Sequence, residues 1–451
     1  MPTDTTDTFV ASIKGFISKT GLPLPHTDKP MIVALSGGAD SVALLSVMTT
    51  LGYKCIAAHC NYHLRGEESD RDELHARSIA KQLNVPILVE HFDVGEYRSA
   101  TNESSIEVAC RDLRYRWFEE LRQRHNGLGI AVGHNSDDNC ETAIFNLLRG
   151  SGISGLRGML AKNERHVIRP MLTVSRTDIE QYLNRMRLTY ITDSSNLTND
   201  YSRNKIRNQI LPEIKRYFPD ARNGMLRTIS NIQDQEKLYR QLLEDKKKLY
   251  TTDVAPVTID LKKLIENEPS AALMVYEWFK SYGLSRTQAE NIIAAANSTG
   301  ATFSSADHIW TIDRGSLIKI DNHGPSAAAL HDLYDIEEHD ISEFHPDRNP
   351  DIAYFDASKI KITDLSVRYP QTGDRIKPFG MKGTKLVSDI LAEARVPAAL
   401  KNRIPLLMND KEILWISGIR ASSMYKVTDK TTSFLKIRYK KQTKYQKQTE
   451  C

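Results

Sequence analysis

Hydrophobic and polar positions alternate in a regular order over the first 150 residues. Four short apolar runs have the length and composition of buried strands: 30–35, 54–59, 86–92 and 129–133. Each run is followed by a segment with helical periodicity: 40–51, 67–83, 104–121 and 136–148. Strands that alternate with helices form a parallel sheet through right-handed crossovers, with helices on both faces. The pattern therefore predicts an α/β domain with a doubly wound parallel sheet.

The pattern changes after residue 160. We expect a strand at 166–170, a helix at 175–186, a long helical stretch at 202–250, helices at 271–282 and 286–296, a β-like piece at 308–320, and strands at 413–418 and 433–439. These elements predict a mostly helical middle domain and a small α+β C-terminal domain.

The length of 451 residues suggests two or three domains. We divide the chain into an α/β domain at 1–217, a mostly helical domain at 218–330, an acidic linker at 331–355, a C-terminal α+β domain at 356–440 and a basic tail at 441–451. The predicted linker contains His-Pro-Asp-Arg-Asn-Pro, a composition that disfavours regular structure.

The composition favours a globular protein and argues against several other classes. Charged residues make up 26% of the chain and hydrophobic residues 40%. The longest apolar runs, at 31–35 and 292–296, are far shorter than the roughly 20 residues that span a bilayer, and the polar start lacks a secretory apolar region. The 5 cysteines include no CxxC pair and form no disulfide or zinc pattern. We therefore expect a cytoplasmic protein with no membrane partner.

The formal net charge of +4 conceals regions of opposite sign. Residues 161–250 carry 18 basic and 11 acidic side chains, residues 331–350 carry 1 and 7, and residues 351–451 carry 20 and 10. Basic regions bind phosphate backbones by releasing counterions, although a charged segment is often only a solvated face. Nucleic acid is therefore one of two interpretations of these regions.

The sequence Ser-Gly-Gly-Ala-Asp-Ser at 36–41 lies where the first predicted strand ends and the first helix begins. Two glycines allow a tight turn whose backbone N–H groups point outward, and the helix N-terminus adds a partial positive charge. Such a loop favours an anion such as pyrophosphate. It lacks the GxxxxGK[ST] pattern of a Walker loop. The alternative is a strand-to-helix turn in which Ser36 only caps the helix.

Acidic residues follow the fourth predicted strand. In the segment 133–142, His134 precedes Asp137 and Glu141, which share one helical face at i, i+4. Mg²⁺ binds one or two carboxylates and completes its shell with water and phosphate, which suits Asp40 together with acids of this segment. The first and fourth strands are neighbours in doubly wound sheets, so the two segments should face each other. The alternative is that these acids only complement the helix dipole.

Spacing alone does not assign two further segments. After the second predicted strand, His59 and Arg65 either contact a nucleotide or acceptor or belong to an ordinary helix start. Glu107, Arg111 and Tyr115 share one helical face, where an i, i+4 ion pair is the simpler explanation.

The Ser-Gly-Gly-x-Asp-Ser arrangement resembles the PP-loop of the N-type ATP pyrophosphatases, a Rossmann-like superfamily whose members split ATP between the α and β phosphates. The resemblance implies that residues 1–217 form an ATP-dependent catalytic domain and leaves the acceptor open. The residues that it implies for nucleotide binding are Ser36, Gly37, Gly38, Ala39, Asp40, Ser41, His59, Arg65 and His134.

Longer stretches resemble one family of that superfamily, the tRNA(Ile)-lysidine synthetases (TilS). They are HCNYHLRGEESDRDE at 59–73, EVACRDLRY at 107–115, GHNSDDNCET at 133–142, RNKIRNQILP at 203–212 and WISGIR at 415–420. The resemblance implies ATP-dependent attachment of free L-lysine to C2 of the wobble cytidine in a tRNA(Ile) with a CAU anticodon, through an adenylated cytidine.

This reaction gives the candidate residues their expected roles. Asp40, Asp137 and Glu141 are expected to be catalytic and to hold Mg²⁺. Because the amine of free lysine has a pKa of about 10.4, a base or a desolvated pocket is needed, and Asp137 and Glu141 are both candidates for the base. Contacts to tRNA are expected from Arg111, Arg114, Arg203, Arg207, Arg375, Arg403 and Arg420. A homodimer is a possible assembly.

Two other functions stay open. Another PP-loop enzyme that thiolates or amidates a tRNA base would use the same ATP site, although the missing CxxC pair argues against thiolation. A non-enzymatic, nucleotide-sensing RNA-binding protein would bind ATP without tRNA-dependent release of pyrophosphate.

Overall fold

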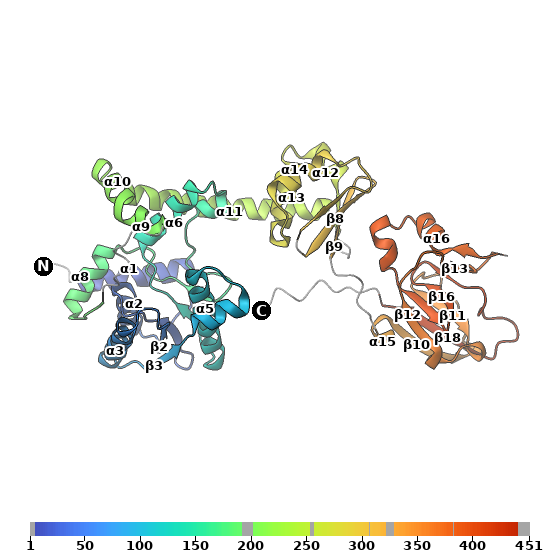
Figure 1. The fold of residues 1–451 in the computed structure, drawn as a ribbon, viewed down its shortest axis with the longest axis horizontal. Coiled ribbons are helices and arrows are strands. Elements are labelled where there is room, and N and C mark those ends of the chain that lie inside the picture. Colours follow the sequence, from blue (N-terminus) through green and yellow to red (C-terminus); the bar gives the residue numbers. More distant parts are fainter. Residues whose placement is uncertain are drawn as a thin grey trace. The chain divides into compact units, whose positions relative to one another are not determined.

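The computed structural model describes residues 5–191, 202–252, 257–305, 307–321, 329–381 and 383–440. The chain divides into two compact units, Met1–Leu238 and Tyr239–Cys451, and each is considered by itself (Figure 1). The predicted basic tail at 441–451 lies outside the described residues.

The first unit is built on a five-stranded parallel sheet. Its strands are β1 (Met31–Ala34), β2 (Cys55–Asn61), β3 (Ile87–His91), β4 (Gly129–Ala131) and β5 (Val167–Ile168), in the order β3-β2-β1-β4-β5. Strands β1 and β4 pair in parallel, and the strand order reverses between them. This confirms the predicted doubly wound sheet. Ligands bind at such a switch point, beyond the carboxyl ends of the strands.

The helices that precede, connect and follow these strands are α1 (Thr5–Thr20), α2 (Ala39–Thr50), α3 (Glu67–Gln82), α4 (Val94–Thr101), α5 (Ile106–Arg124), α6 (Ser136–Leu148), α7 (Ile153–Leu156) and α8 (Arg176–Met186). Five of them, α2, α3, α5, α6 and α8, correspond to predicted helices. Helices α1, α4 and α7 were not predicted.

Hydrophobic side chains cover both faces of the sheet. Met31 and Val33 of β1 pack in one cluster with residues of α1, α2 and α8. Ile32 points to the opposite face and packs with Trp117 and Phe118 of α5. Because successive strand side chains point to opposite faces, the continuous apolar run of β1 is what a strand buried on both faces requires.

The predicted helical stretch at 202–250 is interrupted. It contains α9 (Ser202–Lys205), a π-helical turn η2 (Ile206–Ile210), α10 (Leu211–Tyr217) and α11 (Ala221–Tyr250). The break falls at Phe218, whose backbone is non-helical (φ −130°, ψ 83°). Pro219 follows it, and a proline displaces the preceding residue from the helical region.

The second unit begins with a small α/β assembly. An antiparallel sheet contains β6 (Thr258–Asp260), β9 (Ser316–Asp321), β8 (His308–Asp313) and β7 (Thr302–Ser304) in that order. The helices of this part are α12 (Leu261–Asn267), α13 (Ala271–Phe279) and α14 (Arg286–Ala294). The predicted helices and the β-like piece are confirmed, whereas β6 and β7 were not predicted.

The remaining part of the second unit is the predicted α+β C-terminal domain. Its elements are α15 (Leu330–Leu333), β10 (Tyr334–Asp340), β11 (Ile352–Asp356), β12 (Leu365–Arg368), β13 (Arg375–Ile376), β14 (Lys385–Leu386), α16 (Val387–Glu393), β15 (Leu406–Asn409), β16 (Glu412–Ile416), β17 (Arg420–Ala421) and β18 (Ser433–Tyr439). The sheets have the orders β10-β18-β11 and β12-β15-β16-β17, and β13 pairs with β14.

The segment at 331–355, predicted as an acidic linker, contains regular structure in β10 and most of β11. The His-Pro-Asp-Arg-Asn-Pro stretch at 345–350 contains no helix or strand, as its composition predicts. Within this segment β10 pairs with β18 along its whole length. Asp335 lies opposite Arg438, and Glu337 lies opposite Lys436. Acidic residues therefore face basic residues across the two strands, a favourable pairing that the acidic composition of one strand alone does not reveal.

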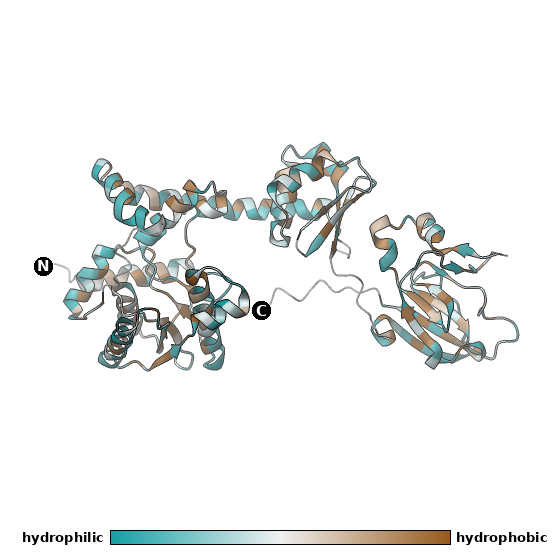
Figure 2. Ribbon diagram, in the orientation of Figure 1, coloured by the Kyte–Doolittle hydropathy of each residue, from teal (hydrophilic) through white to brown (hydrophobic). Residues whose placement is uncertain are grey.

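No helix among the described residues is long and apolar enough to cross a membrane. Figure 2 shows that hydrophilic and hydrophobic positions alternate along the helices, including α11, instead of forming a continuous apolar segment.

Candidate active site

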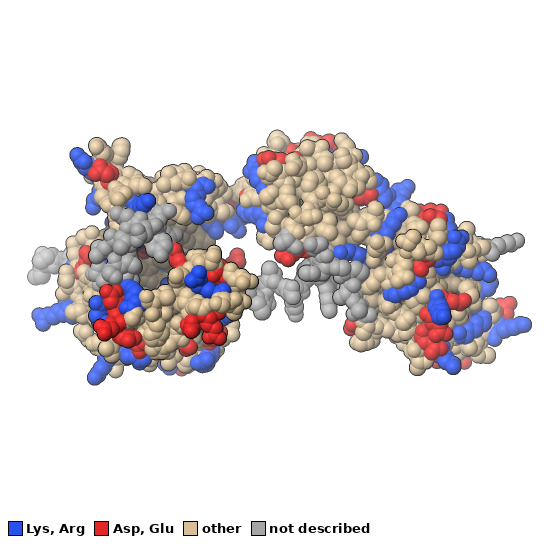
Figure 3. Space-filling view, viewed as in Figure 1, with Lys and Arg blue, Asp and Glu red and all other residues tan. Residues whose placement is uncertain are grey.

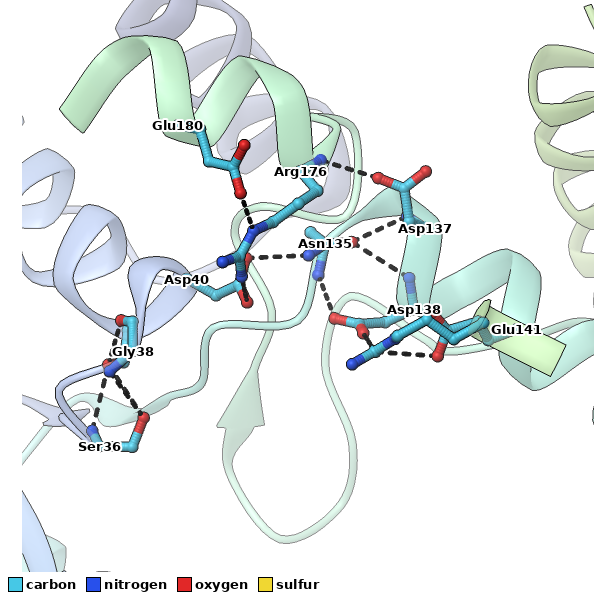
Figure 4. A network of polar contacts seen from close by, with 11 residues as sticks. Ser36, Gly38, Asp40, Asn135, Asp137, Asp138, Glu141, Arg176 and Glu180 are labelled. Atoms are coloured by element: carbon cyan, nitrogen blue, oxygen red, sulfur yellow. Dashed lines mark hydrogen bonds and ion pairs between the residues drawn. The ribbon is translucent and has the colours of Figure 1, made fainter. Parts of the chain in front are cut away.

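The loop between β1 and α2 carries the Ser-Gly-Gly motif. Gly37 has φ +91°, a conformation that favours glycine. Ser41 Oγ donates to the Gly38 carbonyl oxygen at 2.9 Å and accepts from the Ser36 backbone N–H at 3.1 Å (Figure 4). The N-cap of α2 is Gly38, which makes no side-chain capping bond, so Ser36 is not the helix cap. A helix start without a side-chain cap suits an anionic ligand.

The segment that follows β4 lies against this loop. A Cβ atom on Gly133 would be 2.9 Å from the carbonyl carbon of Asp40 and 3.1 Å from the backbone nitrogen of Ser41. Only glycine allows the two backbones to come so close. The segments after β1 and β4 therefore face each other, as the strand order predicts.

Both carboxylate oxygens of Asp40 accept hydrogen bonds. Asn135 Nδ2 donates to Oδ1 at 3.0 Å, and Arg176 Nη1 donates to Oδ2 at 2.6 Å (Figure 4). Asp137 belongs to the same group, because its Oδ2 accepts from the backbone N–H of Arg176 at 2.7 Å. The Arg176 guanidinium also donates to Glu180 at 2.8 Å. The start of α8 thus brings Asp40 and Asp137 together.

A second guanidinium organises the other acids of α6. Arg207 Nε donates to Glu141 Oε1 at 2.6 Å, and Nη2 donates to Glu141 Oε2 at 2.9 Å and to Asp138 Oδ1 at 2.6 Å. Arg207 lies in the π-helical turn η2. The Glu141 side chain is only 3% exposed. We refer to Asp40, Asp137, Asp138 and Glu141 as the acid cluster. Arg207, predicted as a tRNA contact, therefore lies within this cluster.

Burial raises the pKa of the Asp138 carboxyl to about 6. The Asn135 backbone N–H and the Arg207 guanidinium favour its charged form, while the nearby carboxylates of Glu141 and Asp40 disfavour it. A carboxyl with a pKa near neutral pH is suited to proton transfer.

The acids differ in how well they fit a magnesium ion. No group of three or more His, Cys, Asp and Glu side chains in the described ranges could hold a metal ion. Mg²⁺ needs only one or two protein carboxylates when phosphate and water complete its shell. Asp40 and Asp137 fit, because both are partly exposed and Arg176 links Asp137 to Asp40 in the phosphate loop at 36–41. Glu141 does not, because its side chain is buried.

Two of the residues expected to bind nucleotide make internal contacts. His59 is buried, its Nδ1 lies 2.8 Å from the carbonyl oxygen of Leu35, and burial lowers its pKa. His59 thus supports the backbone directly before the phosphate loop. Arg65 Nη2 donates to Asp72 Oδ2 at 3.1 Å.

Several residues of the site were missed by the sequence analysis. They are Asn135, Asp138, Arg169 and Arg176. Asn135 and Asp138 form a capping box at the start of α6, a local pattern that the sequence displays. Arg169 Nε donates to His134 Nδ1 at 3.1 Å. Arg176 and Asp40 are 136 positions apart, so no local pattern indicates their contact.

Among the other arginines expected to contact tRNA, Arg111 and Arg114 lie on α5. The guanidinium carbons of Arg111 and Arg114 lie 5.1 and 5.2 Å from the ring centroid of Tyr115. The side chain of Arg203 lies outside the described residues.

In the C-terminal domain, Arg375 Nε donates to Thr384 Oγ1 at 3.1 Å. Arg420 is exposed at the start of β17, and Arg403 is half-buried at the end of a 3₁₀ turn, η7 (Ala398–Arg403). Figure 3 shows many Lys and Arg side chains on the visible face of this domain, which is at the right.

Known families match three parts of the chain. Residues 6–214 match the PP-loop domain, residues 253–320 match the TilS substrate binding domain, and residues 365–438 match the TilS substrate C-terminal domain.

Curated relatives match nearly the full length. A protein of Parabacteroides distasonis named tRNA(Ile)-lysidine synthase is 37% identical over 425 residues, which cover 91% of this chain and 96% of that protein. The protein of the same name from Bacteroides thetaiotaomicron is 36% identical and covers 92% and 96%. That of Clostridium acetobutylicum is 30% identical and covers 91% and 95%. With its ATP-binding PP-loop domain and both TilS domains, this chain belongs to the tRNA(Ile)-lysidine synthase family.

Proposed function

We propose that this protein attaches free L-lysine to C2 of the wobble cytidine of a tRNA(Ile) with a CAU anticodon, and that ATP is converted to AMP and pyrophosphate. The observation that carries the proposal is the backbone contact between Gly133 and Asp40, which joins a phosphate loop to a cluster of acids. The names of the full-length relatives support the same reaction.

The loop at 36–41 and the start of α2 hold the ATP phosphates through backbone N–H groups. Asp40 and Asp137 hold Mg²⁺, which would neutralise charge on the phosphates and on the departing pyrophosphate. His59 supports the backbone of the phosphate loop through its contact with the Leu35 carbonyl oxygen. His134, which follows β4, contributes to nucleotide binding. Arg65, held by Asp72, completes the nucleotide side of the site.

The chemistry proceeds in two substitutions. The C2 oxygen of the cytidine attacks the α phosphorus, and the bond to pyrophosphate breaks. The uncharged ε-amine of lysine then attacks C2, and the bond from C2 to the oxygen of AMP breaks. The uncharged amine loses one proton as its bond to C2 forms, so a base must accept that proton.

Asp138 is better suited than Asp137 or Glu141 to act as the general base that accepts this proton. Its pKa is raised to about 6 by burial, so it is ionised at pH 7 while its affinity for a proton is higher than that of an ordinary aspartate. Glu141 has another role in this proposal, since it positions Arg207, which in turn contacts Asp138.

The tRNA contacts come from arginines of both units. Arg111, Arg114 and Arg203 belong to the first unit, and Arg375, Arg403 and Arg420 belong to the C-terminal domain. Guanidinium groups bind phosphates and stack on unpaired bases, which are the two elements that RNA loops present.

A homodimer is a possible assembly of this protein. Sedimentation analysis of the full-length protein would distinguish this homodimer from a monomer.

Labelled lysine tests the reaction directly. The full-length protein with ATP, Mg²⁺ and unmodified CAU-anticodon tRNA(Ile) should yield lysine-bearing tRNA, together with one pyrophosphate for each lysine. A tRNA with a methionine identity and the same anticodon serves as the matched control. Pyrophosphate release that depends on sulfide or ammonia instead of lysine would replace this proposal with a thiolating or amidating enzyme.

A further inference from the structure

An open pocket of about 440 Å³ lies at the C-terminal end of α6. Its lining residues are Phe145, Leu148, Arg149, Lys205, Ile206 and Ile210. The end of α6 supplies the first three, and the junction of α9 with η2 supplies the rest. The pocket therefore adjoins the acid cluster, because Glu141 and Arg207 lie on the same two elements.

The lining combines a flat apolar surface with positive charge. The guanidinium carbon of Arg149 lies 5.2 Å from the ring centroid of Phe145. Leu148 and Ile210 are 68% and 38% exposed, although both are large hydrophobic residues. Arg149 and Lys205 are exposed cations at the same place, and no carboxylate lines the pocket.

This combination selects among the molecules that take part in the proposed reaction. Free lysine is a poor occupant, because its cationic side chain would meet Arg149 and Lys205. The ATP phosphates belong to the loop at 36–41 instead. An unpaired nucleotide satisfies both features, since its base stacks on aromatic and guanidinium planes and its phosphate pairs with a cation.

We propose that this pocket binds the base of a nucleotide directly next to the reacting cytidine in the anticodon loop. The inference rests on the proposed function and extends it, by assigning a second base-binding site to the catalytic unit. Phe145 follows Glu141 by four residues, about 6 Å along the helix axis, so the neighbouring nucleotide can reach Phe145 while the cytidine is at the acids. The base stacks on Phe145, and Lys205 pairs with its phosphate.

A double-mutant cycle on the full-length protein tests this site. One arm replaces Phe145 with leucine, which keeps the apolar volume and removes the aromatic face. The other arm uses two tRNAs that lack only the base on the 5′ side or only the base on the 3′ side of the reacting cytidine. Binding is measured without ATP, so the result does not depend on turnover.

Loss of one stacked base should raise the Kd of the wild-type protein about tenfold for one of the two abasic tRNAs. Phe145→Leu should raise the Kd for intact tRNA by a similar factor and show no further loss with that abasic tRNA. Phe145→Trp should restore the coupling. The matched control is Phe218→Leu, which alters an aromatic residue of the same unit that is 68% exposed and should be additive with either abasic tRNA.

If the increases in Kd caused by Phe145→Leu and by each missing base were additive, the base-binding site would be ruled out. It would also be ruled out if Phe145→Leu changed nothing except the KM for lysine, which would rise. Wild-type lysine incorporation is measured separately. A protein that couples Phe145 to a base but incorporates no lysine would retain the base-binding site and lose the proposed function. A protein that incorporates lysine without coupling would retain the function and lose the site.

Discussion

Arg207 engages both carboxylate oxygens of Glu141, at 2.6 and 2.9 Å, in a part of α6 where the Glu141 side chain is 3% exposed. Removing the half-buried Arg207 leaves the buried Glu141 carboxylate without its cationic partner. We expect Arg207→Ala to lower the free energy of unfolding of the first unit by about 3 kcal/mol, as measured by hydrogen exchange of α6 amides. Arg207→Lys should recover only part of the lost free energy of unfolding, because an ammonium group cannot form the bidentate contact with Glu141.

An exposed ion pair provides the matched control for that experiment. Arg286 and Glu290 lie one helical turn apart on α14, with side chains 55% and 54% exposed. We expect Arg286→Ala to cost less than about 1 kcal/mol. Equal losses for the two variants would show that Arg207 stabilises the fold no more than a surface arginine does.

The contact between Gly133 and Asp40 predicts a strong effect from a single methyl group. Gly133→Ala places a Cβ 2.9 Å from the Asp40 carbonyl carbon, and backbone cannot yield as a flexible side chain does. We expect a fall of at least tenfold in kcat/KM for ATP, measured by pyrophosphate release. Gly15→Ala is the control, since nothing lies within 4 Å of its added Cβ. Equal activity of the two variants would contradict the role of this contact.

Local signals in the sequence predict the sheet and the phosphate loop well. The run at 30–35 is apolar at every strand position because both faces of β1 are buried, and the glycines that follow it mark the turn at Gly37. Strand β10 was not predicted, because its acidic side chains pair with basic side chains of β18 that lie about 100 positions later in the chain. The helical stretch predicted at 202–250 continues through the break at Phe218, although the predicted domain boundary falls there and Pro219 marks it.

The acids of the site could be located by sequence, but their partners could not. Asp137 and Glu141 share a helical face, as the i, i+4 spacing predicts, yet Asp137 faces Arg176 and Glu141 faces Arg207. The nearest of these partners is 39 positions away. Spacing places residues on one element, whereas the partner that each carboxylate meets depends on how the elements pack.

The raised pKa of Asp138 predicts how activity depends on pH. Burial raises this pKa to about 6, and the base must be ionised to accept a proton, so kcat/KM for lysine should fall as the pH drops below about 6. Asp138→Asn should lower kcat by at least a hundredfold and remove this acidic limb from the pH profile. Asp137→Asn should instead raise the magnesium concentration needed for half-maximal rate. An unchanged acidic limb in Asp138→Asn would assign the ionisation to another group.

Asp356 predicts a separate pH dependence in the C-terminal domain. Burial alone would raise the pKa of this carboxyl, but hydrogen bonds from Ser358, Lys359 and Thr431 outweigh it and lower the pKa to about 2. The stabilisation, about 2 kcal/mol, is therefore present above pH 4 and is lost as the pH falls towards 2. Asp356→Asn should remove it at pH 7, read from hydrogen exchange of β18. The exposed Asp429→Asn is the control and should change stability by less than about 0.5 kcal/mol.

Charge removal at Arg420 tests the proposed tRNA surface of the C-terminal domain. Arg420 is exposed in β17 opposite Ile416, at one end of β16, whereas the exposed Lys411 precedes the other end of the same strand. A phosphate contact releases about one counterion, so Arg420→Gln should weaken tRNA binding and reduce the slope of log Kd against log salt by about one unit. Lys411→Gln removes the same charge and should leave both quantities unchanged. A slope in Arg420→Gln that is unchanged from the wild-type protein would mean that the charge of Arg420 is only a solvated surface charge. Equal reductions of the slope in both variants would mean that binding responds to the net charge of the domain instead of to a contact at β17.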